Sequence, residues 1–172
     1  MRLKQICELS SPRAFSRVWS DLSLAGVATV NARMSTGDTY EISDDPARID
    51  RDAAWAYLST EAYWGRYRTR ADFDHQVDIA WRVVGAYAPD GSMVGFCRAL
   101  SDGVGLAYLA DLHVLAPHRG HGLGKRLVAA MIDEGPGAGF RWLLHTDDAH
   151  TLYEQFGFAA PDSTVLQRPG QR

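Results

Sequence analysis

Cysteine is scarce in this sequence, and so are the features that mark several other classes of protein. Two cysteines, Cys7 and Cys97, cannot make a disulfide framework, and the six histidines show no metal-ligand spacing. No apolar run approaches the roughly 20 residues of a membrane-spanning helix. The formal net charge is -3, whereas nucleic-acid-binding proteins usually carry a basic excess. We therefore expect a cytoplasmic protein with no metal, no membrane and no nucleic-acid partner, and with Cys97 as a buried, inert thiol.

What the sequence does contain is typical of one globular domain. Of its 172 residues, 46% are apolar and 23% are charged, which is enough for a substantial core. Residues 1–33 differ, because basic side chains dominate there and a short apolar run, 22–30, precedes "VNA", as in a signal peptide. Charged residues directly before that run argue against a signal peptide. We interpret 1–33 as a weakly structured or upstream-start extension, and 34–172 as the folded domain.

Hydrophobic spacing predicts strands and helices that alternate in the second half of the chain. Strands are expected at 39–43, 106–116 and 140–146, in a hairpin at 81–100 around Pro89-Asp90-Gly91, and as a last edge strand at 163–168. Helices are expected at 43–60, 69–80, 122–134 and 147–156, the second capped by Thr69 and the last ended by Gly157. This order predicts a single α/β domain with a mixed sheet.

The stretch "HRGHGLGKRL", residues 118–127, places three glycines among basic residues. It is not a Walker phosphate loop, because Arg119 stands where the first glycine belongs and neither Ser nor Thr follows Lys125. A dinucleotide fingerprint needs its third glycine where Lys125 stands. The pattern Arg-x-x-Gly-x-Gly does match, at Arg119, Gly122 and Gly124. It follows a predicted strand and opens a predicted helix, which is the context of a phosphate-binding loop.

The charges in this stretch also favour an anion as its ligand. Lys125 and Arg126 fall in the first turn of the predicted helix, where the helix dipole disfavours cations by roughly 0.3–1 kcal/mol each. An anion bound at that helix end reverses the sign and also satisfies the free backbone N–H groups. The alternative is a glycine-rich turn with solvated basic side chains. Spacing, context and charge together predict a diphosphate site.

Two segments resemble the hallmarks of the GNAT superfamily of acyl-CoA N-acyltransferases. "VLAPHRGHGLGKRL" is similar to the coenzyme A motif of that family, and "DAHTLYEQFGF" is similar to its Ala-x-x-Leu-Tyr-x-x-x-Gly-Phe helix. The resemblance covers about Thr39 to Arg168. It implies a central mixed, mostly antiparallel β-sheet flanked by helices, acetyl-CoA as co-substrate and a homodimer as an unsurprising assembly. The sequence departs from the family at Thr146, where many members carry an Asn that contacts the pantetheine arm.

The resemblance also implies residue roles for the coenzyme. The main chain of Leu112 and Val114 would pair with pantetheine like an added strand, and the Val114 N–H would stabilise the oxyanion. Tyr153 falls where the family's general acid lies; the alternative is a packing tyrosine. The diphosphate would be held by the loop residues Arg119, Gly120, His121, Gly122, Leu123, Gly124 and Lys125.

The acceptor side of the site is less specified by the sequence. Strand alternation places Asp111 and His113 on one face, and Asp111 could bind the substrate ammonium or act as base; capping a loop is the alternative. Family resemblance implies that Glu61, Tyr63 and Trp64 line the acceptor pocket, unless these aromatics only pack under a loop. The acceptor would be a primary amine of a small molecule or peptide. A non-catalytic acyl-CoA-binding module and a transferase for bulkier acyl groups are the alternative functions.

Overall fold

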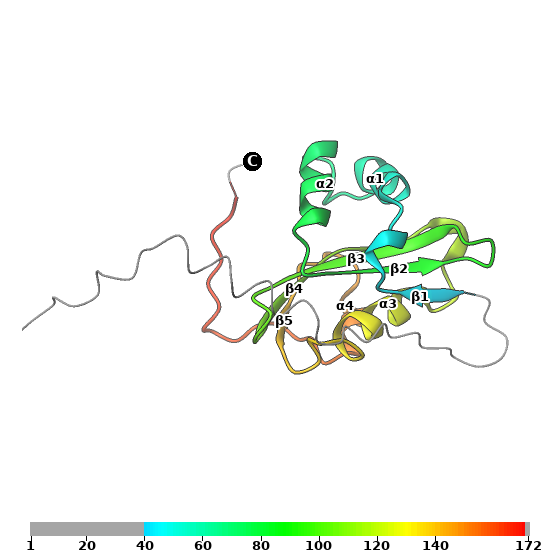
Figure 1. Ribbon diagram of the computed structural model, residues 1–172. Helices are drawn as coiled ribbons and strands as arrows, with labels where there is room; N and C mark the ends of the chain where they lie inside the picture. The colour runs from blue at the N-terminus through cyan, green and yellow to red at the C-terminus, as the bar shows by residue number, and fades with distance from the viewer. Residues whose placement is uncertain (1–39, 171–172) are drawn as a thin grey trace, which may run out of the picture.

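The computed structural model describes residues 40–170, and a five-stranded mixed sheet forms its centre (Figure 1). The strand order is β1-β2-β3-β4-β5; all neighbours are antiparallel except β4 and β5, which are parallel. The strands are β1 Glu41–Ser43, β2 Arg82–Tyr87, β3 Met93–Ser101, β4 Leu106–Val114 and β5 Arg141–Leu143. The predicted α/β domain with a mixed, mostly antiparallel sheet is confirmed. The predicted extension over 1–33, with Cys7, lies outside the described residues.

The hairpin between β2 and β3 forms as its turn sequence predicts. Gly91 adopts a left-handed φ of 84°, and its N–H donates to the Ala88 carbonyl. The Asp90 carboxylate accepts from the Ser92 N–H at 2.9 Å, which closes the turn locally. The hairpin supplies the two central strands against which both helical layers pack.

Two helices cover one face of the sheet, α1 Arg51–Thr60 and α2 Arg70–Asp78 (Figure 1). The predicted cap of α2 is confirmed, because Thr69 and Asp72 form a reciprocal capping box. The single helix predicted from residue 43 is wrong at its start. A separate 3-10 turn, Pro46–Arg48, precedes α1, because Asp45 caps the turn and Asp50 then caps α1 in its own right.

The other face of the sheet carries α3 Leu123–Ile132 and α4 His150–Glu154. The apolar side of α3 packs Leu127 and Met131 against the sheet with no exposed surface. Cys97 lies in the same cluster as a free, fully buried cysteine, and burial raises the pKa of its thiol. The inert thiol predicted for Cys97 agrees with this environment.

Several predicted boundaries at the C-terminal end need correction. Residues 163–168 form no strand, and Leu166 is 94% exposed, so the predicted edge strand is wrong. β5 stops at Leu143 rather than at 146, because β4 and the following segment separate there. α4 is shorter than 147–156, although Gly157 adopts the left-handed φ of 79° expected of a helix-ending glycine.

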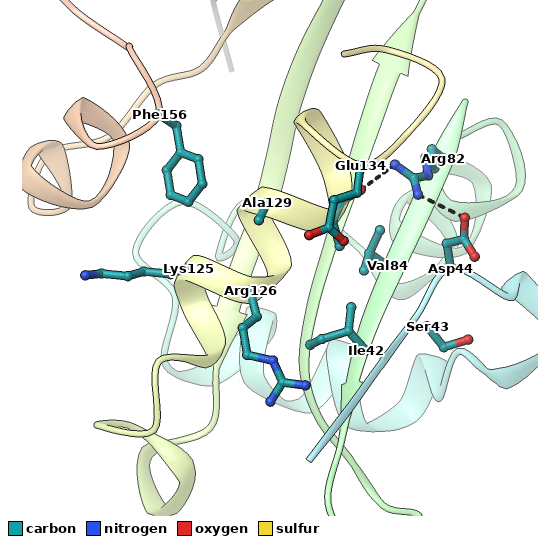
Figure 2. Close-up of a pocket in the computed structure, with 11 residues that line it drawn as sticks. Ile42, Ser43, Asp44, Arg82, Val84, Lys125, Arg126, Ala129, Glu134 and Phe156 are labelled. Carbon is teal, nitrogen blue, oxygen red and sulfur yellow. Dashed lines mark hydrogen bonds and ion pairs between the residues drawn. The ribbon is translucent and has the colours of Figure 1, made fainter. Parts of the chain in front are cut away.

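Arg82 joins β2 to α3 and to the segment that follows β1, on the α3 side of the sheet (Figure 2). Its guanidinium donates to the carbonyls of Ala130 and Met131 at 2.6 and 2.9 Å. It also donates to the Asp44 carboxylate at 2.9 Å. A cation at those carbonyls also complements the negative end of the α3 dipole. The Arg82 and Asp44 side chains are 8% and 12% exposed, so their charges are largely removed from water. This pairing orients α3, whose first turn belongs to the glycine-rich loop.

We expect Arg82→Met to lower the free energy of unfolding by about 2–4 kcal/mol, because it leaves Asp44 and two carbonyls without their donor. Arg51→Met is the matched control. Arg51 pairs with Asp78 at 2.7 Å, but both side chains are more than a third exposed, and such pairs contribute about 0–1 kcal/mol. Urea unfolding followed by circular dichroism measures both variants. Equal stabilities of the two variants would contradict this role of Arg82.

Candidate active site

A cleft opens where β4 and β5 separate. The two strands pair only from Leu106 with Arg141 to Tyr108 with Leu143, among the described residues. β4 continues to Val114, so within residues 40–170 its edge facing β5 has no strand partner beyond Tyr108. A cavity of about 400 Å³ lies there, between the α1–α2 connection, the second half of β4 and the segment leading into α4.

The backbone of Val114 faces this open edge. The Leu115 N–H donates to the Val94 carbonyl of β3 at 2.8 Å. Because successive residues of an antiparallel strand direct their N–H groups to opposite sides, the Val114 N–H points away from β3. The Val114 carbonyl accepts from the Arg119 Nε at 2.9 Å on that same side. The predicted position of Val114 at an unpaired strand edge therefore agrees with the geometry.

A β-bulge at Asp111 shapes the open part of β4. Phe96 pairs with His113 and Arg98 pairs with Ala110, so two residues of β4 stand opposite Cys97 alone. Asp111 has a φ of 58° and is the one non-glycine residue with positive φ between residues 40 and 170. The extra residue keeps Leu109 and Leu112 on the α3 side of the sheet, while Asp111 turns toward the other layer.

The Asp111 carboxylate lies between two buried arginines. Arg68 donates to it through Nη1 and Nη2 at 2.9 and 2.8 Å, and Arg98 donates through Nε at 2.6 Å. The three side chains are only 3–6% exposed. Gln76 accepts from both arginines, at 2.8 and 3.3 Å. Sequence analysis missed Arg68, Gln76 and Arg98; an arginine inside the apolar run of β3 is the signal that could have found this cluster.

These contacts favour a positioning role for Asp111 over the predicted role as base. Burial disfavours the charged carboxylate, but hydrogen bonds and charges from Arg68 and Arg98 outweigh it and lower its pKa. A carboxylate with a lowered pKa and three guanidinium contacts is a weak proton acceptor. The cluster instead holds the bulge of β4 against the α1–α2 layer.

His113, which shares a strand face with Asp111, does not line the cavity. Its ring stacks on Tyr57 with centroids 4.2 Å apart, and its Nδ1 donates to the Asp111 carbonyl at 3.0 Å. Burial lowers the pKa of His113 to about 4, so the ring is neutral at pH 7. It packs α1 onto the sheet.

We expect Asp111→Asn to destabilise the fold by about 3–5 kcal/mol at pH 7, because two buried guanidinium groups lose their counter-charge. The lowered pKa of Asp111 means that its contribution is present above the unfolded-state pKa of about 3.9 and is lost as pH falls through the folded-state value. The gap between wild type and variant should therefore shrink below about pH 4. Urea unfolding at several pH values measures it.

Asp78→Asn is the control for that experiment, since the Asp78 side chain is 60% exposed and pairs only at the surface. It should cost less than about 1 kcal/mol. A stable Asp111→Asn protein that binds coenzyme A but does not turn over would instead support the role as base.

Tyr153 lies on α4 at the cleft. Its residue is 8% exposed, and its ring packs edge-to-face on Phe158 with centroids 5.8 Å apart. Burial raises its pKa to about 12, so the hydroxyl is protonated at neutral pH. The residue lines the cavity. Thr146, which replaces the family asparagine, accepts from the Ala149 N–H at 3.0 Å before α4 begins.

The glycine-rich loop presents a run of unpaired backbone donors. Gly120 and Gly122 have left-handed φ values of 84° and 73°, and Gly122 precedes α3 without a side-chain cap. The N–H groups from Gly120 to Lys125 donate to no group of the described chain, and the first helical bond is from Arg126 to Gly122. Such a helix start is suited to an oxyanion.

Side chains of the loop divide between holding the loop and facing solvent. Arg119 bridges the Val114 carbonyl and the Tyr57 hydroxyl, and His121 contacts carbonyls of its own loop. The Leu123 side chain is buried in the core, so only its backbone N–H is available to a ligand. Lys125 is exposed, has no partner between residues 40 and 170, and extends away from Arg126 (Figure 2).

The residues predicted for the acceptor pocket are only partly brought together. Tyr63 and Trp64 line the cavity, and their rings pack edge-to-face with centroids 4.7 Å apart. The Tyr63 hydroxyl also accepts from the Asp147 N–H at 3.0 Å, which bridges the two sides of the cleft. Glu61 is exposed at the end of α1 and does not line the cavity.

Comparison with known proteins agrees with this architecture. The family model of the GNAT acetyltransferases matches residues 47–158. A proposed acetyltransferase of Gibberella zeae is 27% identical over 156 residues, which are 87% of this chain and 84% of that protein. The crystal structure of a proposed GNAT-family acetyltransferase from Xanthomonas campestris pv. campestris is 30% identical, with a TM-score of 0.72, and covers 79% of this chain and 96% of that one.

A third match shares the fold at lower identity. N-acetylglutamate synthase from Neisseria gonorrhoeae, solved with coenzyme A and N-acetyl-glutamate, is 18% identical with a TM-score of 0.60, covering 77% of this chain and 31% of that chain. Fold and matches together define an acyltransferase architecture. This chain belongs to the GNAT acetyltransferase family.

The helices between residues 40 and 170 include none with the length and apolar character of a membrane span.

Proposed function

We propose that this protein transfers the acetyl group of acetyl-CoA directly to a primary amine of a small molecule or peptide. One observation carries the proposal: the unpaired N–H groups of 120–125 lie at the end of the open β4 edge, and Tyr153 lines the same cleft. A diphosphate at the loop would direct the attached pantetheine along that edge. The thioester would then lie within the cleft.

The main chain supplies the contacts to the coenzyme. Backbone N–H groups from Gly120 to Lys125 bind the diphosphate, with the Lys125 ammonium adding positive charge. Leu112 and Val114 pair with the pantetheine amides as an added strand would. The Val114 N–H donates to the thioester oxygen, and one such donor typically contributes about 10²–10³ in rate.

Proton transfer completes the reaction. The neutral amine attacks the thioester carbon, and the oxyanion intermediate collapses as the C–S bond breaks. Tyr153 donates its proton to the leaving sulfur and regains one, through water, from the nitrogen that has become cationic. The products are the N-acetylated acceptor and free coenzyme A. A module that only bound acyl-CoA would have no use for a protonated hydroxyl at this place.

Gly124→Val tests the coenzyme site with little effect on the fold. A Cβ at Gly124 would meet only the Leu152 side chain, at 3.7 Å, and the residue has no left-handed φ. We expect affinity for coenzyme A, measured by calorimetry, to fall at least tenfold, because the side chain blocks the diphosphate from the backbone. Gly139→Val is the control, since its Cβ would meet nothing within 4 Å and it lies outside the glycine-rich loop. Unchanged affinity in Gly124→Val would remove the diphosphate from this loop.

Tyr153→Phe tests the general acid. The substitution keeps the ring that packs on Phe158, so stability and coenzyme affinity should change little. We expect kcat to fall about 100-fold with little change in KM, the pattern of an interaction made only in the transition state. Coenzyme release with a promiscuous amine, monitored by thiol detection, provides the rates. A variant with the parent rate, under conditions where chemistry limits turnover, would exclude Tyr153 as the acid.

A further inference from the structure

The floor of the cleft carries more positive than negative charge. Arg68 and Arg98 face a single carboxylate, that of Asp111, and Gln76 adds only a neutral amide. A guanidinium group is a permanent cation in proteins. With side chains 4% and 6% exposed, the two arginines have lost most of the water that would otherwise solvate this unmatched charge. A desolvated, uncompensated cation is unfavourable unless an anion joins it.

Two donors of the same arginines are also unused. The Arg68 Nε and the Arg98 Nη1 are buried and have no hydrogen-bond partner among the described residues. Both side chains line the cavity. A carboxylate in the cavity would lie next to both guanidinium groups. The unmatched charge and the unused donors point to the same kind of ligand, a small oxyanion.

The rim of the cavity has the opposite charge. Asp147 and Asp148 are exposed on the segment between β5 and α4, and they line the cavity together with Tyr153. The cavity thus has a cationic, buried floor and an acidic, open rim, with Tyr63 and Trp64 as aromatic walls. Such a distribution complements a molecule that has an amine at one end and an anionic group at the other.

We infer that the acceptor is an amino acid or another amine bearing a carboxylate, and that Arg68 and Arg98 bind this carboxylate. The inference rests on the proposed acetyl transfer, whose amine must reach the thioester beside Tyr153. A carboxylate matches the single surplus charge of the floor. A phosphate dianion would add a second negative charge next to Asp111.

The test measures kcat/KM of the full chain, at saturating acetyl-CoA, for pairs of acceptors that differ only in the presence of a carboxylate. The pairs are glycine with methylamine, phenylalanine with phenethylamine, and lysine with cadaverine; phosphoethanolamine serves as the phosphate probe. We expect the carboxylated member of at least one pair to have a kcat/KM about 10- to 100-fold higher, because charge-assisted hydrogen bonds to guanidinium are lost without it.

Arg98→Lys identifies the residue responsible. Lysine keeps a positive charge near Asp111 but lacks the planar fork of donors that a guanidinium offers to a carboxylate. The preference for the carboxylated acceptor, which is the ratio of the two kcat/KM values within a pair, should fall about tenfold. Arg51→Lys, on the exposed side of α1, should leave the preference unchanged.

The outcomes separate this inference from the proposed function. If decarboxylated amines react as well as their partners in every pair, or if Arg98→Lys retains the full preference, the carboxylate site is overturned and acetyl transfer stands. Preference for phosphoethanolamine overturns the carboxylate assignment. If coenzyme A binds but no amine releases it, acetyl transfer fails. Calorimetry on the complex with coenzyme A then tests the carboxylate site by itself. Tighter binding of phenylalanine than of phenethylamine supports the carboxylate site, and equal binding overturns it.

Discussion

The separation of β4 from β5 after three residue pairs is the constraint on which the site depends. A sheet that continued to pair would have used the backbone groups of β4 and would have left no space between the helical layers. Because the strands diverge, the Val114 N–H faces an open edge, and α4 can bring Tyr153 into the same cleft. The cavity, the free strand edge and the position of the hydroxyl thus have one geometric origin.

The open strand is held in place by the ion cluster around Asp111. A φ of 58° is unfavourable for a non-glycine residue such as Asp111, so other contacts must hold the backbone in that conformation. The unpaired edge of β4 supplies few hydrogen bonds for this purpose. Three contacts from Arg68 and Arg98 supply the restraint from the α1–α2 side. The same arginines line the cavity and retain unused donors, so the restraint of β4 and the proposed recognition of a carboxylate use one set of side chains.

The glycine-rich loop contributes through its backbone rather than its side chains. Arg119 is occupied with the end of β4, and Leu123 is part of the core. What remains toward solvent is a series of N–H groups at the start of α3 and the ammonium of Lys125. Arg82 orients α3 from its other end, so contacts far from the loop help to fix the direction of those donors.

The sequence alone determined the parts of this protein whose signals are local. The Pro89-Asp90-Gly91 turn, the Thr69 cap, the apolar side of α3 and the start of α3 after the glycine-rich loop each depend on neighbours in the chain, and each was predicted from them. The arginine cluster could not be read in this way, because Arg68, Arg98 and Asp111 are brought together from three elements separated by 13 to 43 positions. The end of β5 and the bulge of β4 were likewise decided by tertiary structure. Both depend on how two strands diverge across the sheet, and strand divergence is a property of the packed layers and of no single segment.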